Sequence, residues 1–374
     1  MRVVFIASHE FTSGKTDGSH HTIRRNYELW CKAFGEENIY VVSFSNINYE
    51  TDVKNIMYFP KHRNKVEQMK NAIFLRNGYN ARTEKMVKKY ISELHPDVIY
   101  FDHSFTGRLL KNLNISSDVK IVTFMHNVER DYVWDKVVKE NILFFPAFIS
   151  YALNEKYLIS RANIIINFNR RDANRVAKIY KKESDFFLPI TYTDVFDKGK
   201  ISEPSIKKKK LLWIGTYFGP NVHGLFWFIE RVLPFINDVE LCVLGYNTEK
   251  LKGKISDNKV KVIGTVEDLS PYYYDADAVV QPIFYGSGMK TKTAQILMYG
   301  KAMFATDEAI EGYDCNGSEH IYRVNTAEEY IDAISAFFRG KHKKYYDDVR
   351  KVFLDNHCTE KKENEFIDFL RKSI

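Results

Sequence analysis

The chain has 374 residues, 45% of them hydrophobic and 15% aromatic, which is typical of a folded globular protein long enough for two domains. Its formal net charge of +7 suits an anionic ligand or an acidic membrane surface, but also an ordinary soluble protein. No run of eighteen apolar residues occurs, which argues against a bilayer-spanning helix. Four distant cysteines without a CxxC pair argue against a metal cluster or disulfide framework and favour a reducing cytoplasm.

Short apolar, β-branched runs alternate with helical patterns, which predicts parallel sheets with crossover helices. The expected strands form two series, the first at 3–8, 39–44, 97–102, 120–125 and 163–168, and the second at 207–217, 239–246, 260–266, 277–283, 302–307 and 320–324. Two such series predict an α/β protein with two doubly wound domains. The expected divisions are a first domain at 1–190, a polar linker at 191–209, a second domain at 210–357 and a charged amphipathic closing helix at 358–374.

Ligands of such sheets bind beyond the carboxyl ends of the strands, and clefts between domains are favoured. Gly286-Ser287-Gly288 follows one expected strand of the second series and leads, with Lys290 and Lys292, into a helix. Glycines let backbone N–H groups approach an anion, a helix N-terminus carries partial positive charge, and lysines add point charges for a diphosphate. An ordinary turn with solvated lysines is an equally open reading of this stretch alone.

Two more loops follow expected strands. The loop at 215–221 lies between an expected strand and an expected helix. It either contacts a ligand or is a packing turn in which Pro220 and Asn221 start the helix. His126 comes directly after the strand at 120–125. A lone histidine is more often structural, but this place at a strand terminus favours a functional role.

Two motifs are weaker than they look. Residues 13–16 resemble the end of a Walker phosphate-binding loop, but that pattern requires glycine at position 9, where this chain has histidine. Gly18 is therefore the better candidate for a close backbone approach to a ligand. Asp275-Ala276-Asp277 resembles a DxD metal motif, yet it leads into an apolar strand and is expected to cap or end a helix. No metal site is predicted.

Together these loops resemble the retaining glycosyltransferases of family four (group 1). The run GSGMKTKTAQILMYGKAMFATDEAIEGY (286–313) is similar to that family's donor-binding segment. IGTYFGPNVHGLFWFIERVLP (214–234) and VIGTVEDLSPYYYDADAVVQPI (262–283) are similar to two other segments, in the family's order. The resemblance implies the GT-B fold of two facing Rossmann-like domains with a cleft between them, and a closing helix that packs back on the first domain.

The resemblance also implies an activity, a metal-independent hexosyl- or other glycosyltransferase without cofactors. It would move a sugar from a UDP- or GDP-type donor to a saccharide or lipid-linked acceptor, with retention at C1, in surface polysaccharide or glycoconjugate synthesis. The implied catalytic residues are His126, beside the donor sugar, and Lys290 and Lys292, beside the diphosphate. The implied donor-binding residues are Gly18, Thr216, Asn221, Thr265, Val266, Gly286, Ser287, Gly288, Gln295, Glu311 and Gly312.

Ser287 and Gln295 depart from the resemblance, because many members have glutamates at these two positions. Gln295 can still hydrogen-bond a ribose hydroxyl. The alternative is a non-catalytic GT-B subunit that binds a glycan or a partner glycosyltransferase. A sugar-nucleotide epimerase would need acid/base carboxylates in the cleft, and none stands out. Nucleic-acid binding is not indicated, because the basic residues form no recognisable module.

One basic and apolar region is expected on the acceptor side. Residues 61–90 hold nine Lys/Arg against two Glu, with Met69, Ile73 and Phe74 interleaved, and residues 141–152 are rich in aromatics. Such a face suits an anionic membrane that carries a lipid-linked acceptor. The competing reading makes 61–90 a solvated helical face and 141–152 a core segment. The expected location is the cytoplasm, with peripheral binding to the inner face of the membrane.

Overall fold

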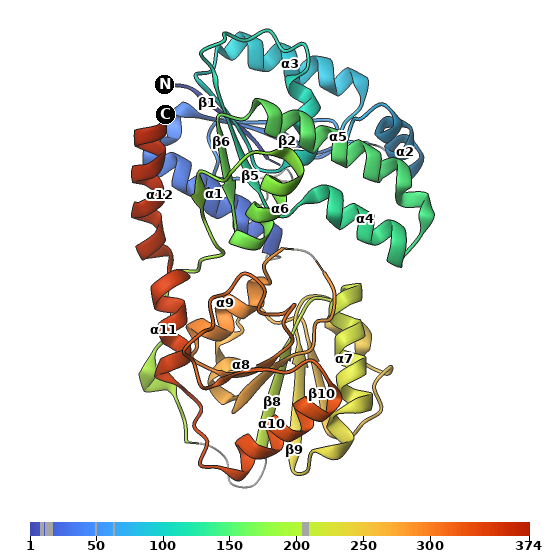
Figure 1. Cartoon of the computed structure of the whole chain (residues 1–374), viewed down its shortest axis with the longest axis vertical. Coiled ribbons are helices and arrows are strands. Elements are labelled where there is room, and N and C mark those ends of the chain that lie inside the picture. Colours follow the sequence, from blue (N-terminus) through green and yellow to red (C-terminus); the bar gives the residue numbers. More distant parts are fainter. Residues whose placement is uncertain (8–10, 12–17, 49–50, 63, 204–208, 287) are drawn as a thin grey trace. The chain divides into compact units, whose positions relative to one another are not determined.

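The computed structural model describes residues 1–374 except 8–10, 12–17, 49–50, 63, 204–208 and 287 (Figure 1). The chain forms two compact units, unit 1 with Met1–Leu188 and Glu363–Ile374, and unit 2 with Pro189–Lys362. The stretch at 191–209 falls within unit 2, where it contains a short 3-10 helix at Lys198–Lys200.

Unit 1 is built on a seven-stranded parallel sheet of order β3-β2-β1-β4-β5-β6-β7. Strands β1, β4 and β6 are buried along their whole length, as expected for a parallel sheet that is covered on both faces. The strands are β1 (Val3–Ile6), β2 (Ile39–Phe44), β3 (Ile56–Phe59), β4 (Val98–Phe101), β5 (Lys120–Met125), β6 (Ile164–Asn167) and β7 (Phe186–Phe187). The two edge strands, β3 and β7, were not expected from the sequence.

The helices of unit 1 begin at asparagines in several places. Asn64, Asn80 and Asn169 each accept a hydrogen bond from the N–H three residues later, which satisfies a free donor of the first turn. The helices are α1 (Gly18–Phe34), α2 (Lys65–Ile73), α3 (Ala81–Leu94), α4 (Glu129–Lys139), α5 (Phe145–Arg161) and α6 (Arg170–Tyr180), with 3-10 helices η1 (Glu36–Asn38), η2 (Ser104–Leu110) and η3 (Ile142–Phe144).

The final helix, α12 (Thr359–Ser373), packs mainly on unit 1. Phe366 and Leu370 are buried, and the ring of Phe366 lies 5.3 Å from that of Phe186. Arg371 donates from Nε to the carbonyl oxygen of Ala33 at 3.1 Å, near the C-terminus of α1. A cation there satisfies a free carbonyl and complements the helix dipole.

Unit 2 has a six-stranded parallel sheet of order β10-β9-β8-β11-β12-β13. The strands are β8 (Lys209–Ile214), β9 (Val239–Leu244), β10 (Val260–Gly264), β11 (Ala278–Gln281), β12 (Ala302–Ala305) and β13 (Ile321–Arg323). The helices are α7 (Gly219–Arg231), α8 (Ser270–Asp275), α9 (Thr291–Met298), α10 (Ala327–Arg339) and α11 (Asp347–Asn356), with 3-10 helices η5 (Leu233–Phe235) and η6 (Thr248–Leu251). The expected α/β protein with two doubly wound domains is confirmed.

No helix among the residues that the structure describes is both long enough and apolar enough to cross a bilayer.

Candidate functional site

The strand order of unit 2 locates the candidate site. After β8 the chain adds β9 and β10 on one side of β8, and it then adds β11, β12 and β13 on the other side. The strand order therefore reverses between β8 and β11. Ligands of doubly wound sheets bind beyond the carboxyl ends of the strands at such a reversal. The two loops that follow these strands are residues 215–218 and 282–290, the same loops that the sequence selects.

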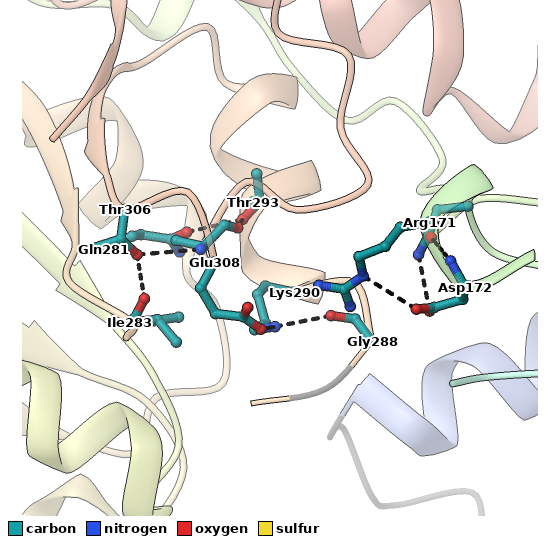
Figure 2. A network of polar contacts seen from close by, with 11 residues as sticks. Arg171, Asp172, Gln281, Ile283, Gly288, Lys290, Thr293, Thr306 and Glu308 are labelled. Atoms are coloured by element: carbon teal, nitrogen blue, oxygen red, sulfur yellow. Dashed lines mark hydrogen bonds and ion pairs between the residues drawn. The ribbon is translucent and has the colours of Figure 1, made fainter. Parts of the chain in front are cut away.

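The loop at 282–290 carries the expected anion-binding residues. Gly288 has a φ of 66°, a backbone conformation that favours glycine. Nζ of Lys290 donates to the Gly288 carbonyl oxygen at 2.9 Å and lies 2.6 Å from Oε1 of Glu308 (Figure 2). The Lys290 ammonium is therefore held beside the glycine loop by a carboxylate from the loop after β12. Ser287 lies outside the described residues.

Lys292 lies one residue into α9, where it contacts Gln295. Its Nζ donates to Oε1 of Gln295 at 3.1 Å. Burial lowers the pKa of Lys292 to about 8, because the charged form loses water without gaining a carboxylate partner of comparable effect. The two residues that the sequence assigns to the diphosphate and the ribose are thus in direct contact.

A buried polar network fixes the three segments around these lysines (Figure 2). Oγ1 of Thr293 donates to Oε1 of Gln281 at 2.9 Å and lies 2.8 Å from the carbonyl oxygen of Ala309. The Thr306 hydroxyl donates to the carbonyl oxygen of Ile283. The end of β11, the start of α9 and the loop after β12 are therefore tied together by hydrogen bonds between buried residues.

The loop after β8 is held by Asn221. Its Nδ2 donates to the carbonyl oxygen of Thr216 at 3.3 Å and to Oγ1 of Thr216 at 3.2 Å. The structure thus brings these two expected donor-binding residues together at the start of α7.

Thr265 and Val266 follow β10. The Thr265 hydroxyl donates to Oε2 of Glu249 at 2.8 Å and accepts from the backbone N–H of Asn247 at 2.9 Å. Val266 is partly buried. These bonds join the loops after β9 and β10 at the carboxyl edge of the sheet.

Glu311 and Gly312 lie in the loop after β12, Glu311 partly buried and Gly312 exposed. The next residue, Tyr313, donates from its hydroxyl to the carbonyl oxygen of Lys290 at 2.8 Å. This bond attaches the loop of Glu311 and Gly312 to the segment that carries the lysines.

Asp275 and Asp277, the residues of the DxD resemblance, are occupied by structural contacts. Both carboxylate oxygens of Asp275 lie 2.7 Å from Nζ of Lys210, and Oδ2 of Asp277 accepts from the backbone N–H of Lys210 at 2.7 Å. They lie at the amino edge of the sheet, where β8 and β11 begin, and so away from the carboxyl edge.

In unit 1 the strand order reverses between β1 and β4, and Gly18 begins α1, the helix after β1. His126 follows β5, the neighbour of β4, and is buried. Its Nε2 lies 3.2 Å from Oδ2 of Asp102, and its ring stacks on His103 with centroids 3.9 Å apart. Nδ1 of His103 lies 2.9 Å from Oε1 of Glu129. His126 is therefore part of a cluster of two histidines and two carboxylates.

Burial sets the charges in this cluster. It raises the pKa of Glu129 to about 8 and holds the pKa of His103 well below its usual range, which favours the uncharged form of both groups. Asp102 also accepts from Nδ2 of Asn26 at 2.8 Å and from the Tyr100 hydroxyl at 3.0 Å. These two donors favour the ionised form of a carboxylate.

The sequence reasoning missed several of these side chains: Asp102, His103, Glu129 and, in unit 2, Glu308. A signal for the first two was present, because a polar Asp-His pair ends an otherwise apolar strand. Glu129 and Glu308 gave no such signal, because each is placed beside its partner only by the fold.

Solved structures of glycosyltransferases match the chain over its full length. A sucrose-phosphate synthase from Thermosynechococcus elongatus has a TM-score of 0.72 at 11% identity, covering 100% of this chain and 99% of that one. Anabaena HepE in complex with UDP-glucose has a TM-score of 0.67 at 12% identity, and the lipopolysaccharide outer core galactosyltransferase WaaB has 0.67 at 13%, each covering 100% of both chains. No curated protein sequence matches the chain significantly.

The chain consists of two Rossmann-like units, and together they match these structures. The chain therefore has the GT-B fold. Residues 208–339 match the family described as "Glycosyl transferases group 1". This segment, which contains both loops at the strand reversal of unit 2, is similar to that family.

Proposed function

We propose that the protein transfers a sugar from a UDP- or GDP-type donor to a saccharide or lipid-linked acceptor, with retention at C1. The observation that carries the proposal is the placement of Lys290 and Lys292 beside a glycine loop, at the strand reversal and at the start of α9. HepE, a structural neighbour, is described in complex with UDP and with UDP-glucose.

The proposed chemistry places the lysines at the leaving group. The bond between C1 and the diphosphate oxygen breaks with its electron pair on the diphosphate, and the acceptor hydroxyl forms the new bond to C1 and loses its proton. Fixed cations in a water-poor site stabilise the developing charge, typically by about 2–4 kcal/mol for each donor. Lys290 is held by Glu308 in this structure, so the donor competes with that carboxylate for the ammonium.

The remaining residues take supporting roles. His126 contacts the transferred sugar, and Gly18, Gly286, Ser287 and Gly288 approach the phosphates. Thr216 and Asn221 face the phosphates from the loop after β8. Thr265 and Val266 line the base, Gln295 the ribose, and Glu311 and Gly312 the far side of the pocket. Catalysis is proposed to require neither a metal nor another cofactor, because the lysines supply the positive charge.

The proposed cellular role is synthesis of a surface polysaccharide or glycoconjugate in the cytoplasm, at the inner face of the membrane. All four cysteines are free thiols, which suits a reducing compartment.

Calorimetric titration with UDP, GDP, dTDP and their sugars tests the donor site. We expect one nucleotide class to bind, and Lys290→Ala/Lys292→Ala to weaken its binding at least about a hundredfold. Lys351→Ala, an exposed lysine on α11, is the matched control and should bind like the wild type.

A second measurement separates the enzyme from the non-catalytic subunit, an alternative that Ser287 and Gln295 leave open. The purified chain should release UDP or GDP from its donor sugar, slowly in water and faster with acceptor. Tight donor binding without any turnover would favour the subunit. No binding of any nucleotide by the folded protein would overturn the proposed donor site.

A further inference from the structure

A large apolar surface lies on unit 1, on α2, α4, η3 and α5. More than half of the large apolar side chains that are exposed among the described residues belong to it: Val66, Met69, Ile73, Phe74, Trp134, Val138, Ile142, Leu143, Phe144, Phe145, Ile149 and Leu153. We call this set the apolar surface. Soluble proteins seldom expose contiguous apolar patches of this kind without a function in binding.

The members of the apolar surface are neighbours in space. Helix α5 contacts both α2 and α4 (Figure 1). Nδ2 of Asn154 donates to the carbonyl oxygen of Leu75 at 3.0 Å, which joins α5 to the residues after α2. The ring of Phe148 lies 5.0 Å from Trp134 and 5.9 Å from Phe145, which joins α5 to α4. Two segments far apart in the sequence therefore form one surface.

The turn η3 is the most exposed part of the apolar surface. Ile142 and Leu143 are each 69% exposed, and burial in α5 begins only at Ser150. The reading of residues 141–152 as a core segment is therefore wrong for their first half. Side chains of this kind gain hydrophobic free energy only if something outside unit 1 covers them.

Cations border the apolar surface. Lys61 is exposed before α2, Lys70 is exposed on α2, and Arg82, Lys85 and Lys89 are exposed on α3. Helix α3 is attached to α2 by a bond of 3.1 Å from Nδ2 of Asn80 to Oε1 of Glu67.

Acidic residues cancel only part of this charge, because Nζ of Lys89 lies 3.7 Å from Oε1 of Glu93 on the same helix. Glu84 is buried against Arg76 and Lys88, at 2.7 and 2.5 Å. Glu140 is an exposed acid at the end of α4, where Lys136 lies 4.4 Å from the ring of Tyr132. The border as a whole keeps an excess of positive charge.

The cationic border distinguishes between possible partners. Protein interfaces are depleted of lysine, whereas anionic lipid headgroups attract lysine at the edge of an inserted apolar face. We infer that the apolar surface and its cations bind an anionic phospholipid bilayer, with η3 entering the boundary between headgroups and acyl chains. The inference deepens the proposed function, because the bilayer would carry the acceptor as a lipid-linked saccharide. For this acceptor the inference rests on the proposed function.

Vesicle flotation with the full-length protein tests the inference. We expect binding to vesicles of equal parts phosphatidylcholine and phosphatidylglycerol, and much weaker binding to phosphatidylcholine alone. Ile142→Ser/Leu143→Ser should weaken the apparent affinity for mixed vesicles at least about tenfold, because two apolar side chains no longer insert. Lys85→Gln/Lys89→Gln should weaken it about fivefold for each charge removed.

The matched control is Phe235→Ser, which removes a 65%-exposed aromatic ring from unit 2 and should leave flotation unchanged. The same variants are titrated by calorimetry with the nucleotide that the wild type binds. A variant that loses vesicle binding but keeps nucleotide binding has an intact donor site. Wild-type protein that stays unbound to mixed vesicles would overturn the inference. So would a dimer in sedimentation that Ile142→Ser/Leu143→Ser dissociates, because a second copy would then cover the apolar surface.

Discussion

The rings of His103 and His126 stack in unit 1 with their planes 13° from parallel, and each imidazole faces a different buried carboxylate. One histidine follows β4 and the other follows β5, so neighbouring parallel strands bring them together at the carboxyl edge of the sheet. Because burial favours the uncharged forms of His103 and Glu129, this pair can hold the ring of His126 in place without adding charge beside it.

Glu129→Gln should change the pH dependence of stability. Folding favours the protonated form of Glu129, whose pKa rises from 4.5 to about 8. The folded state then binds more protons than the unfolded state between these values, so this group's contribution to stability falls as pH rises through that window. Glutamine cannot ionise. The Tm of the variant relative to the wild type should therefore rise by about 7–14 °C between pH 5 and pH 8.

The titratable groups that face residue 129 are the same in the wild type and in Glu129→Gln. They are His103, Lys136 and Glu155, whose own pKa burial raises to about 7. Glu93→Gln, an exposed carboxylate on α3, serves as the control. Parallel Tm curves for Glu129→Gln and the wild type would mean that Glu129 is ionised throughout.

His126→Ala should lower kcat while donor binding survives. A side chain that contacts the transferred sugar acts mainly as the bond to the diphosphate breaks, so we expect a loss of about 100–1000-fold in kcat. The Kd for the nucleotide should stay within about twofold, because the proposed phosphate contacts come from other residues. His103→Phe keeps a stacked ring and should lose less activity. Equal losses of kcat and nucleotide affinity in His126→Ala would argue against a role at the sugar.

Donor affinity should fall above pH 8. Lys292 has a pKa of about 8, and a diphosphate binds the protonated form better. The wild-type affinity should be level below pH 8 and then fall by up to about tenfold per pH unit. Lys292→Arg keeps its charge at high pH and should give a flatter profile. Calorimetry from pH 6.5 to 9.5 measures both, and identical profiles would show that Lys292 does not contact the donor.

Gly224→Ala should destabilise unit 2. A Cβ atom at Gly224 would lie 1.6 Å from the carbonyl oxygen of Pro282, so α7 or the start of the glycine loop has to move. Overpacking of this kind costs about 1–3 kcal/mol or more, and we expect a Tm lower by several degrees with weaker nucleotide binding. Gly219→Ala, whose Cβ would be 3.9 Å from the nearest atom, Oη of Tyr285, is the control. Equal Tm values for the two variants would contradict this packing.

The sequence was enough to predict both strand series, because buried parallel strands are continuous apolar runs. It failed at the edges. Strand β3 has four residues, of which only Phe59 is fully buried, and β7 has just two. Edge strands of this kind are defined by pairing with their neighbours, which a sequence pattern does not show.

The site was predictable in its loops but not in its contacts. The loops of Gly288 and Asn221 follow recognisable strands, and both lie at the strand reversal of unit 2. The ion pair of Lys290 with Glu308 joins residues from two different loops, and the cluster around His126 joins side chains from β4, β5 and α4. Such pairs depend on the register of neighbouring strands, and neither residue of a pair indicates the other.

The chain crosses between the two units twice, once near Leu188 and again near Glu363, since α12 returns to unit 1. This has a practical consequence for expression of the units on their own. A fragment that stops at Leu188 would lack Phe366 and Leu370, leave Phe186 uncovered and lose the arginine that caps α1. A stable isolated unit 1 therefore requires residues 363–374 to be grafted back through an artificial connector, whereas unit 2 can be produced as one uninterrupted stretch.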